Sequence, residues 1–157
     1  MMGSGSGGQE LQQLQKQLEA IDAEVEALET EIDELETEHS EIDEAVDALD
    51  TLEDGSTVQV PIGGDAYIRA EIQNIDEVIV SLGGGYAAEQ QQETAVDTLR
   101  TKQDSIEETI KETEAEIAEL EDETEDLEKQ AQAIQQRMQQ QQQQQMSKME
   151  EMQGGDE

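Results

Sequence analysis

Few side chains of this sequence could do covalent or metal chemistry. The chain has one histidine, His39, and no cysteine, so it cannot combine the ligands of a typical zinc site. The glycines at 63–64 and 83–85 lack the lysine and the Ser or Thr of a phosphate-binding loop, and they indicate turns. The 42 acidic residues lack the spacing of a calcium loop. We therefore predict no enzyme activity, no cofactor and no metal.

The remaining chemistry is non-covalent capture of apolar surface, to which methionine is suited because its side chain is flexible and polarizable. Methionines gather near the C-terminus, where an apolar stripe weakens through Thr124, Ala131 and Gln141. We expect the helices to pair less tightly there and to expose apolar side chains. From the residues alone, a frayed terminus whose methionines bind nothing is the simpler interpretation. The candidate binding residues are Leu11, Leu14, Leu18, Ile134, Met138, Met146, Met149 and Met152.

Two apolar stripes must position these residues. One runs from Leu11 to Leu49 and the other from Val96 to Met138, with apolar residues alternately three and four positions apart. This spacing is typical of a coiled coil, because a period of 3.5 residues keeps one stripe of a helix against its partner. If the helices pair antiparallel, residues whose numbers sum to about 145 face each other. His39 lies in the first stripe and is expected to be a polar residue that fixes this register.

The segment between the stripes predicts four short strands. Apolar residues alternate with other types from residue 57 to 62 and from 66 to 72, around a Gly-Gly-Asp turn. A third strand, at 78–82, is apolar on both faces, and a fourth begins at Tyr86. Two isolated hairpins bury too little to be stable, so another chain must cover them. The residues expected to mediate this assembly are Val58, Val60, Ile62, Tyr67, Ile68, Ile72, Val78, Ile79, Val80, Leu82 and Tyr86.

The predicted fold class is mainly α: a long antiparallel two-helix coiled coil interrupted at the bend by two short β hairpins. Glutamines 139–145 could be disordered, helical or self-pairing, and we favour a helical extension because glutamine is a fair helix former. The predicted segments are a flexible N-terminal arm at 1–8, helices at 9–53 and 89–152, the hairpins at 57–88 and a flexible tail at 153–157.

The net charge of −34, from 42 acidic and 8 basic residues, limits the partners. Nucleic acid is excluded as a partner because binding phosphates requires clustered Lys and Arg. No stretch approaches the length of a membrane span, so we expect a cytoplasmic protein without a membrane partner. Acidic residues flank both stripes and would repel across the interface unless salt screens them. We infer a salt-rich cytoplasm; an ordinary acidic coiled coil is the alternative.

The central block resembles a known family. Val-Pro-Ile-Gly-Gly-Asp-Ala-Tyr-Ile at 60–68 and Val-Ile-Val-Ser-Leu-Gly-Gly-Gly-Tyr-Ala-Ala-Glu at 78–89, between two heptad helices, are similar to the α-type subunit of archaeal prefoldin. The α-type subunit carries two hairpins between its helices, whereas the β-type subunit carries one. The resemblance covers the chain from about Leu11 to Met138, and the central block is its specific part.

The resemblance implies an ATP-independent chaperone. Its hexamer contains two α and four β subunits, so the implied partners are a second α subunit and β-type subunits joined through the hairpins. The ends of the coiled coils, remote from the strands, would hold unfolded polypeptides and pass them to a cytosolic group II chaperonin. The alternative is a structural spacer or tether without client binding, although a tether has no use for the two hairpins.

Overall fold

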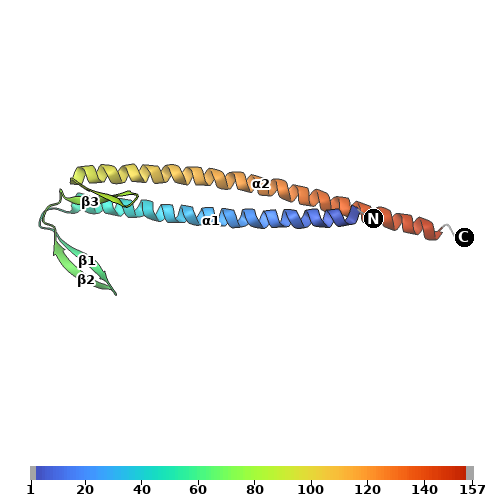
Figure 1. Ribbon diagram of the computed structural model, residues 1–157, viewed down its shortest axis with the longest axis horizontal. Helices are drawn as coiled ribbons and strands as arrows, with labels where there is room; N and C mark the ends of the chain where they lie inside the picture. Colours follow the sequence, from blue (N-terminus) through green and yellow to red (C-terminus); the bar gives the residue numbers. More distant parts are fainter. Residues whose placement is uncertain (1–2, 155–157) are drawn as a thin grey trace. The chain divides into compact units, whose positions relative to one another are not determined.

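Two long helices and four short strands make up the chain, as the sequence predicts. The computed structural model describes residues 3–154 (Figure 1). Within this range no helix is long and apolar enough to cross a membrane. The mainly α fold class, with two β hairpins between the helices, is confirmed. The elements are α1 (Gly3–Thr51), β1 (Thr57–Gly63), β2 (Ala66–Glu71), β3 (Val78–Gly83), β4 (Tyr86–Gln90) and α2 (Gln92–Gly154).

The chain divides into two compact units, and the first comprises residues 32–112. Its helical parts pack through a small core formed by Ile42, Val46 and Ile106, with Val46 only 2% exposed. These residues belong to the predicted stripes, and the covered positions along both helices recur at the expected spacings of three and four residues. The core is a seam rather than a globular interior. Residues that flank it are Leu35, Val96, Leu99 and Ile110.

The second unit comprises residues 1–31 and 113–157. Its helices keep the predicted register, because a Cβ placed on Gly7 would lie 3.2 Å from Met138 Cγ and Sδ. The prediction of a flexible arm at 1–8 differs from the structure, in which α1 begins at Gly3; Met1 and Met2 lie outside the described residues. A Gly/Ser composition normally favours flexibility, but glycine also allows the close approach to Met138.

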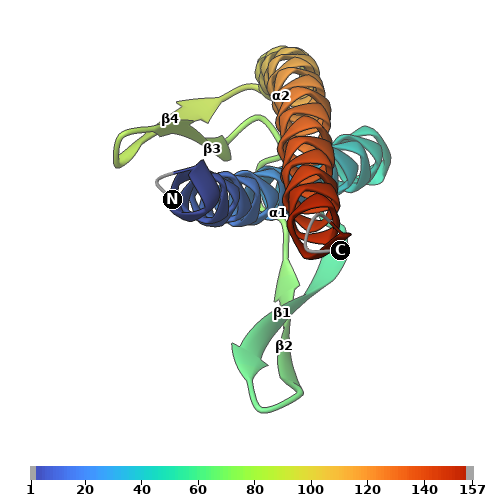
Figure 2. The ribbon, with the colours of Figure 1, turned by 90° about the vertical axis from the view of Figure 1, so that its right-hand side faces the viewer.

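Each hairpin is closed by a two-residue turn. In the first, Gly63 pairs with Ala66, and Gly64 and Asp65 between them both have positive φ. A turn with two positive φ values matches the twist of the flanking strands, and Gly and Asp tolerate it best. Gly84 and Gly85 form the corresponding turn between β3 and β4. The hairpins are separate two-stranded antiparallel sheets, drawn as distinct ribbons in Figure 2.

The helix ends next to the hairpins differ slightly from the prediction. Helix α1 ends at Thr51 instead of residue 53, and α2 begins at Gln92 instead of residue 89 because β4 extends to Gln90. The Gln92 side-chain amide donates to the carbonyls of Leu49 and Leu52, where the last turn of a helix lacks partners of its own. Helix α2 continues through Gly154, two residues into the predicted tail; residues 155–157 lie outside the described range.

Candidate binding surfaces

Large exposed hydrophobic side chains occur in only two places among the described residues. Seven lie on the hairpins and three near the end of α2, and all ten belong to the sets predicted from the sequence. Elsewhere in the described chain, hydrophobic side chains of this size are buried or half-buried. We call the first group the hairpin surface: Val60, Ile62, Tyr67, Ile68, Ile79, Leu82 and Tyr86. We call the second group the terminal surface: Met146, Met149 and Met152.

The β1–β2 hairpin exposes apolar side chains on both faces. Val60 pairs with Ile68 on one face, and both side chains are exposed. Tyr67 pairs with Pro61 on the other face and is 59% exposed. Among the other predicted assembly residues, Val58 and Ile72 are half-buried. A two-stranded sheet in this state is marginal in water and leaves both of its edges open for pairing.

The β3–β4 hairpin is covered on one face only. Val80 is 5% exposed and pairs with Ala88, and Val78 on the same face is half-buried. Ile79, between them in the strand, points to the opposite face and is 75% exposed. The Lys102 ammonium of α2 donates to the carbonyl of Ser81 in β3 at 3.2 Å. The strand is therefore apolar on both faces, as predicted, and no described residue of the chain covers its outer face.

The eight residues predicted to bind clients fall into two groups. Met146, Met149 and Met152 are 72%, 71% and 82% exposed. The other five are covered: Leu14 is 9% exposed, and Leu11, Leu18, Ile134 and Met138 are half-buried. The sequence led us to expect that the helices pair less tightly here and expose apolar side chains. In the structure the three methionines are exposed, whereas the five residues that lie in the seam are covered. The small side chains at Thr124 and Ala131 still pack in the seam, and both are half-buried.

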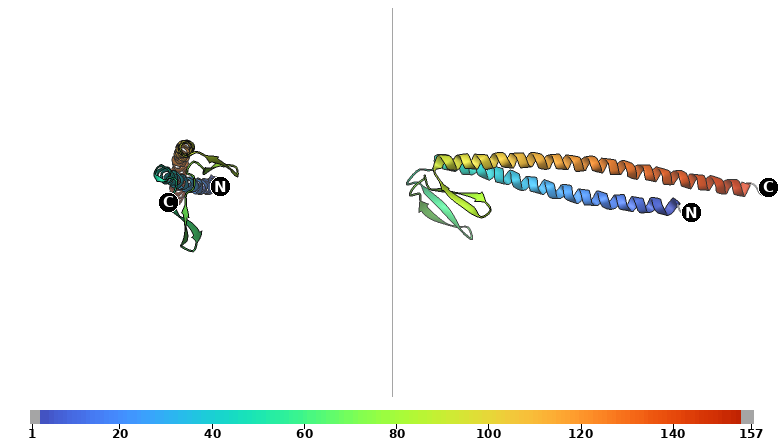
Figure 3. Two further views of the ribbon diagram at one scale, coloured as in Figure 1. Left: turned by 90° about the vertical axis from the view of Figure 1, so that its left-hand side faces the viewer. Right: turned by 45° about the horizontal axis from the view of Figure 1, so that its top comes forward.

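The terminal surface is exposed because α2 extends beyond the described start of α1. With Gly7 opposite Met138, Gly3 lies opposite Gln142, and no described residue of α1 faces the rest of α2. The overhang is visible at the chain ends in Figures 1 and 3. The glutamine tract at 139–145 is helical, and every residue from 139 to 154 is exposed.

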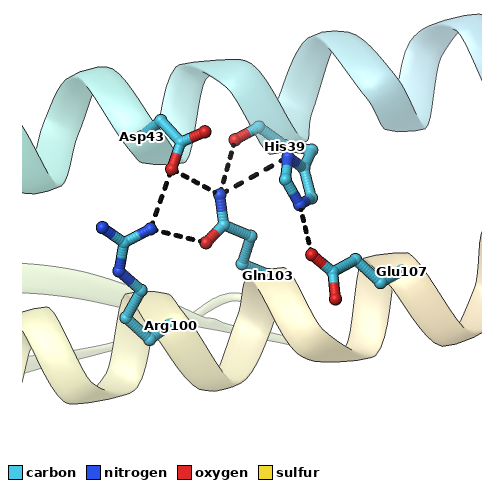
Figure 4. Close-up of polar contacts among 5 residues, drawn as sticks. All are labelled: His39, Asp43, Arg100, Gln103 and Glu107. Atoms are coloured by element: carbon cyan, nitrogen blue, oxygen red, sulfur yellow. Dashed lines mark hydrogen bonds and ion pairs between the residues drawn. The ribbon is translucent and has the colours of Figure 1, made fainter.

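A polar layer interrupts the apolar seam at His39 (Figure 4). The Gln103 side chain, only 6% exposed, donates to the His39 carbonyl at 3.1 Å and to Asp43 Oδ1 at 2.9 Å. Arg100 Nη1 donates to Asp43 Oδ1 at 2.8 Å and to Gln103 Oε1 at 2.7 Å. His39 Nε2 lies 2.8 Å from Glu107 Oε1. Every group of the layer thus has a partner, as a polar seam position requires.

The polar layer shifts the ionisation of one carboxyl group. The hydrogen bond from Gln103 and then that from Arg100 hold the pKa of Asp43 below its usual value of 3.8, because both stabilise the carboxylate. His39 was expected as a polar seam residue, and it does lie in the seam. The sequence did not point to its partners Asp43, Arg100 and Glu107, which lie outside the stripes. Gln103 falls within the second stripe, four residues after Leu99 and three before Ile106. The only other signal was that the numbers of the contacting residues sum, in pairs, to values near those of the apolar layers.

Comparison with known proteins identifies the architecture. The sequence pattern of the family described as "Prefoldin subunit" matches residues 21–144, most of both helices and all four strands. The chain belongs to the prefoldin family. Prefoldin membership explains why hairpins that are unstable alone persist between two helices, since subunits of this family assemble into oligomers.

The prefoldin relatives agree with the α type. The chain is 56% identical over 114 residues to prefoldin subunit alpha of Halorubrum lacusprofundi, covering 73% of this chain and 74% of that one. Identity to prefoldin subunit alpha of Haloarcula marismortui is 59% over 73 residues, and this match spans 46% of the chain and 47% of the relative. A solved structure of filamentous prefoldin from Methanocaldococcus jannaschii is 28% identical, with a TM-score of 0.50 over 76% of this chain and 95% of that one.

Proposed function

We propose that this prefoldin subunit is an ATP-independent holdase that captures unfolded or nascent polypeptides at the end of its coiled coil. The observation that carries the proposal is the confinement of exposed large hydrophobic side chains to the hairpin surface and the terminal surface. A holdase requires one apolar surface for assembly and one for clients. The described residues supply two such surfaces and no others.

The terminal surface has the properties of a client site. Its three methionines project from an unpaired helix, so a client can reach them without breaking the seam. Methionine adapts to partners of different shape, which suits non-native chains without a fixed surface. Leu11, Leu14, Leu18, Ile134 and Met138 would join the site only when the end of the coiled coil opens. The methionines therefore make the first contact in this proposal.

The hairpin surface serves for assembly in this proposal. Its open strand edges and the uncovered face of β3 fit a second α subunit and four β-type subunits, which together make a heterohexamer. Pairing of strand edges would satisfy backbone groups, and the apolar side chains would be buried in the same step. We place the complex in the cytoplasm, where a group II chaperonin would receive the client.

A client-aggregation assay tests the holdase. The assembled complex is mixed with a chemically denatured protein in molar salt, and light scattering is followed. The triple variant M146Q/M149Q/M152Q should lose most of the suppression because it removes the terminal surface. The variant Q140A/Q144A, on the same helix, should keep the suppression because it removes polar side chains only. Unchanged suppression by the methionine variant would contradict the proposed site.

A second assay separates the holdase from a tether. Ile68→Lys places a charge on the exposed face of β2 and should prevent assembly with a β-type subunit, as measured by mass in solution. Thr57→Lys, on the neighbouring strand, adds the same charge at an exposed polar position opposite Glu71 and should leave the mass of the complex unchanged. A chain that remains monomeric with its partner and ignores denatured client would favour the tether.

A further inference from the structure

The charge of the chain is distributed unevenly. From Lys129 to Met149 there are three basic residues and no acidic one, and this is the longest stretch without a carboxylate in a chain of net charge −34. The facing part of α1, residues 3–18, contains one glutamate and one lysine. Residues 129–149, which include Met146 and Met149 of the terminal surface, are therefore basic, whereas Glu150 and Glu151 precede Met152 and most of the remaining helix surface is acidic.

Two of the three basic residues directly precede a methionine. Arg137 precedes Met138 and Lys148 precedes Met149, so the two basic–apolar pairs are 11 residues apart. Eleven residues complete about three turns of a helix, which places both pairs on the same face, roughly 16 Å apart along the axis. Arg137, Lys148 and Met149 are exposed, and Met138 is half-buried beside Gly7.

Neither of these two cations forms an ion pair among the described residues. Within residues 3–154 the only ion pairs closer than 4.0 Å are His39–Glu107 and Arg100–Asp43, both in the polar layer. Glu150 and Glu151 follow Lys148 in the chain, yet neither forms such a pair with it. The positive charges of Arg137 and Lys148 are thus available to a ligand that reaches the neighbouring methionines.

From this we infer that the end of the coiled coil selects non-native segments that are both apolar and acidic. The inference rests on the proposed holdase function and specifies its clients. An acidic chain is repelled by the carboxylates that cover the helices and is attracted only where they are missing. Basic segments, in contrast, would be drawn to the acidic helix faces, away from the methionines. An extended client of about five residues spans the distance between the two pairs, since each residue covers about 3.3–3.6 Å.

Peptide binding to the assembled complex tests this inference. Two fluorescent peptides share their apolar residues and carry either Glu or Lys at two positions five residues apart. We expect tighter binding of the Glu peptide, measured by anisotropy at the lowest salt that preserves full helicity. Each exposed charge pair should contribute roughly 1.5- to 5-fold in affinity, and the preference should shrink in molar salt.

The variants R137Q and K148Q should each reduce the preference, whereas K111Q, an exposed lysine elsewhere on α2, should leave it unchanged. Equal binding of both peptides, or an unchanged preference in R137Q/K148Q, would overturn the charge selection while leaving the holdase intact. Loss of client suppression by the complex itself would instead refute the holdase. A doubled mass that disappears in M146Q/M149Q/M152Q would show that a second copy occupies the methionines, and this too would overturn the inference.

Discussion

The unexpected start of α1 at Gly3 can be tested with two alanine substitutions. Gly7 and Gly8 are adjacent helical residues with different surroundings: a Cβ on Gly8 meets nothing within 4 Å, whereas one on Gly7 lies 3.2 Å from Met138. If both residues are helical, alanine should stabilise each position through its higher helix propensity. If they belong to a flexible arm, neither change should alter the stability of the fold.

The expected magnitudes follow from these surroundings. Gly8→Ala should raise the free energy of unfolding by up to about 0.8–1.0 kcal/mol, the difference between glycine and alanine inside a helix. Gly7→Ala should gain less, because Met138 must move by a few tenths of an ångström. The Met138 side chain is flexible, so we expect the net effect of Gly7→Ala to remain stabilising.

Chemical unfolding of the full chain in molar salt, followed by far-ultraviolet circular dichroism, measures both variants. In the background of Met138→Ala the effects of the two alanine substitutions should become more similar, since only Ile134 Cγ2, at 3.9 Å, then remains within 4 Å of a Cβ on Gly7. Identical wild-type stability in both variants would refute a helix at these residues. A larger gain for Gly7→Ala than for Gly8→Ala would refute the packing against Met138.

Three further predictions concern the seam and its charges. Helicity should be incomplete at about 0.1 M salt and complete at about 1 M, where the Debye length falls from about 10 to 3 Å; dichroism that does not change with salt would contradict the screening argument. Gln103→Ala should lower the free energy of unfolding by about 1–3 kcal/mol, because it leaves polar groups of the layer without their hydrogen-bond partner. The exposed Gln136→Ala should cause no change in the same denaturation assay. The pKa of Asp43 is lower in the folded than in the unfolded state. The stability that the Asp43 carboxylate contributes is therefore complete above the unfolded pKa near 3.8 and is lost as the pH falls through the folded pKa. The stability difference between wild type and Asp43→Asn should therefore vanish in acid, and a difference that persists at low pH would contradict the assigned hydrogen bonds.

The parts of the fold that depend on periodicity were predictable from the sequence. The seam requires only apolar residues spaced alternately three and four positions apart. Once one layer is paired, the register of all other layers follows, and the proximity of Gly7 to Met138 confirms this register. The hairpins were predictable because Gly-Gly-Asp and Gly-Gly-Gly tolerate the positive φ values of tight turns. Both signals are local in the chain and do not depend on distant packing.

Other parts depend on contacts that a single sequence does not show. The start of α1 at Gly3 depends on a residue of the other helix, and composition alone pointed to flexibility. Leu14 and Met138 are covered because the helices remain paired at these residues. The weakening of the apolar stripe had suggested looser pairing there. The polar layer was missed because Asp43, Arg100 and Glu107 lie outside the stripes, and only Gln103 keeps the seam spacing, four residues after Leu99 and three before Ile106.

Charge and apolar exposure are arranged in a complementary way along the chain. Exposed hydrophobic side chains would cause unspecific association if they were spread over the helices, but the carboxylates there keep copies of the chain apart. Salt strong enough to let the two helices pair also weakens this repulsion between chains. Under those conditions, specificity must come from confining the apolar side chains to the hairpin surface and the terminal surface. Moving a single methionine pair onto the acidic part of α2 should thus promote aggregation in molar salt far more than it does in dilute buffer.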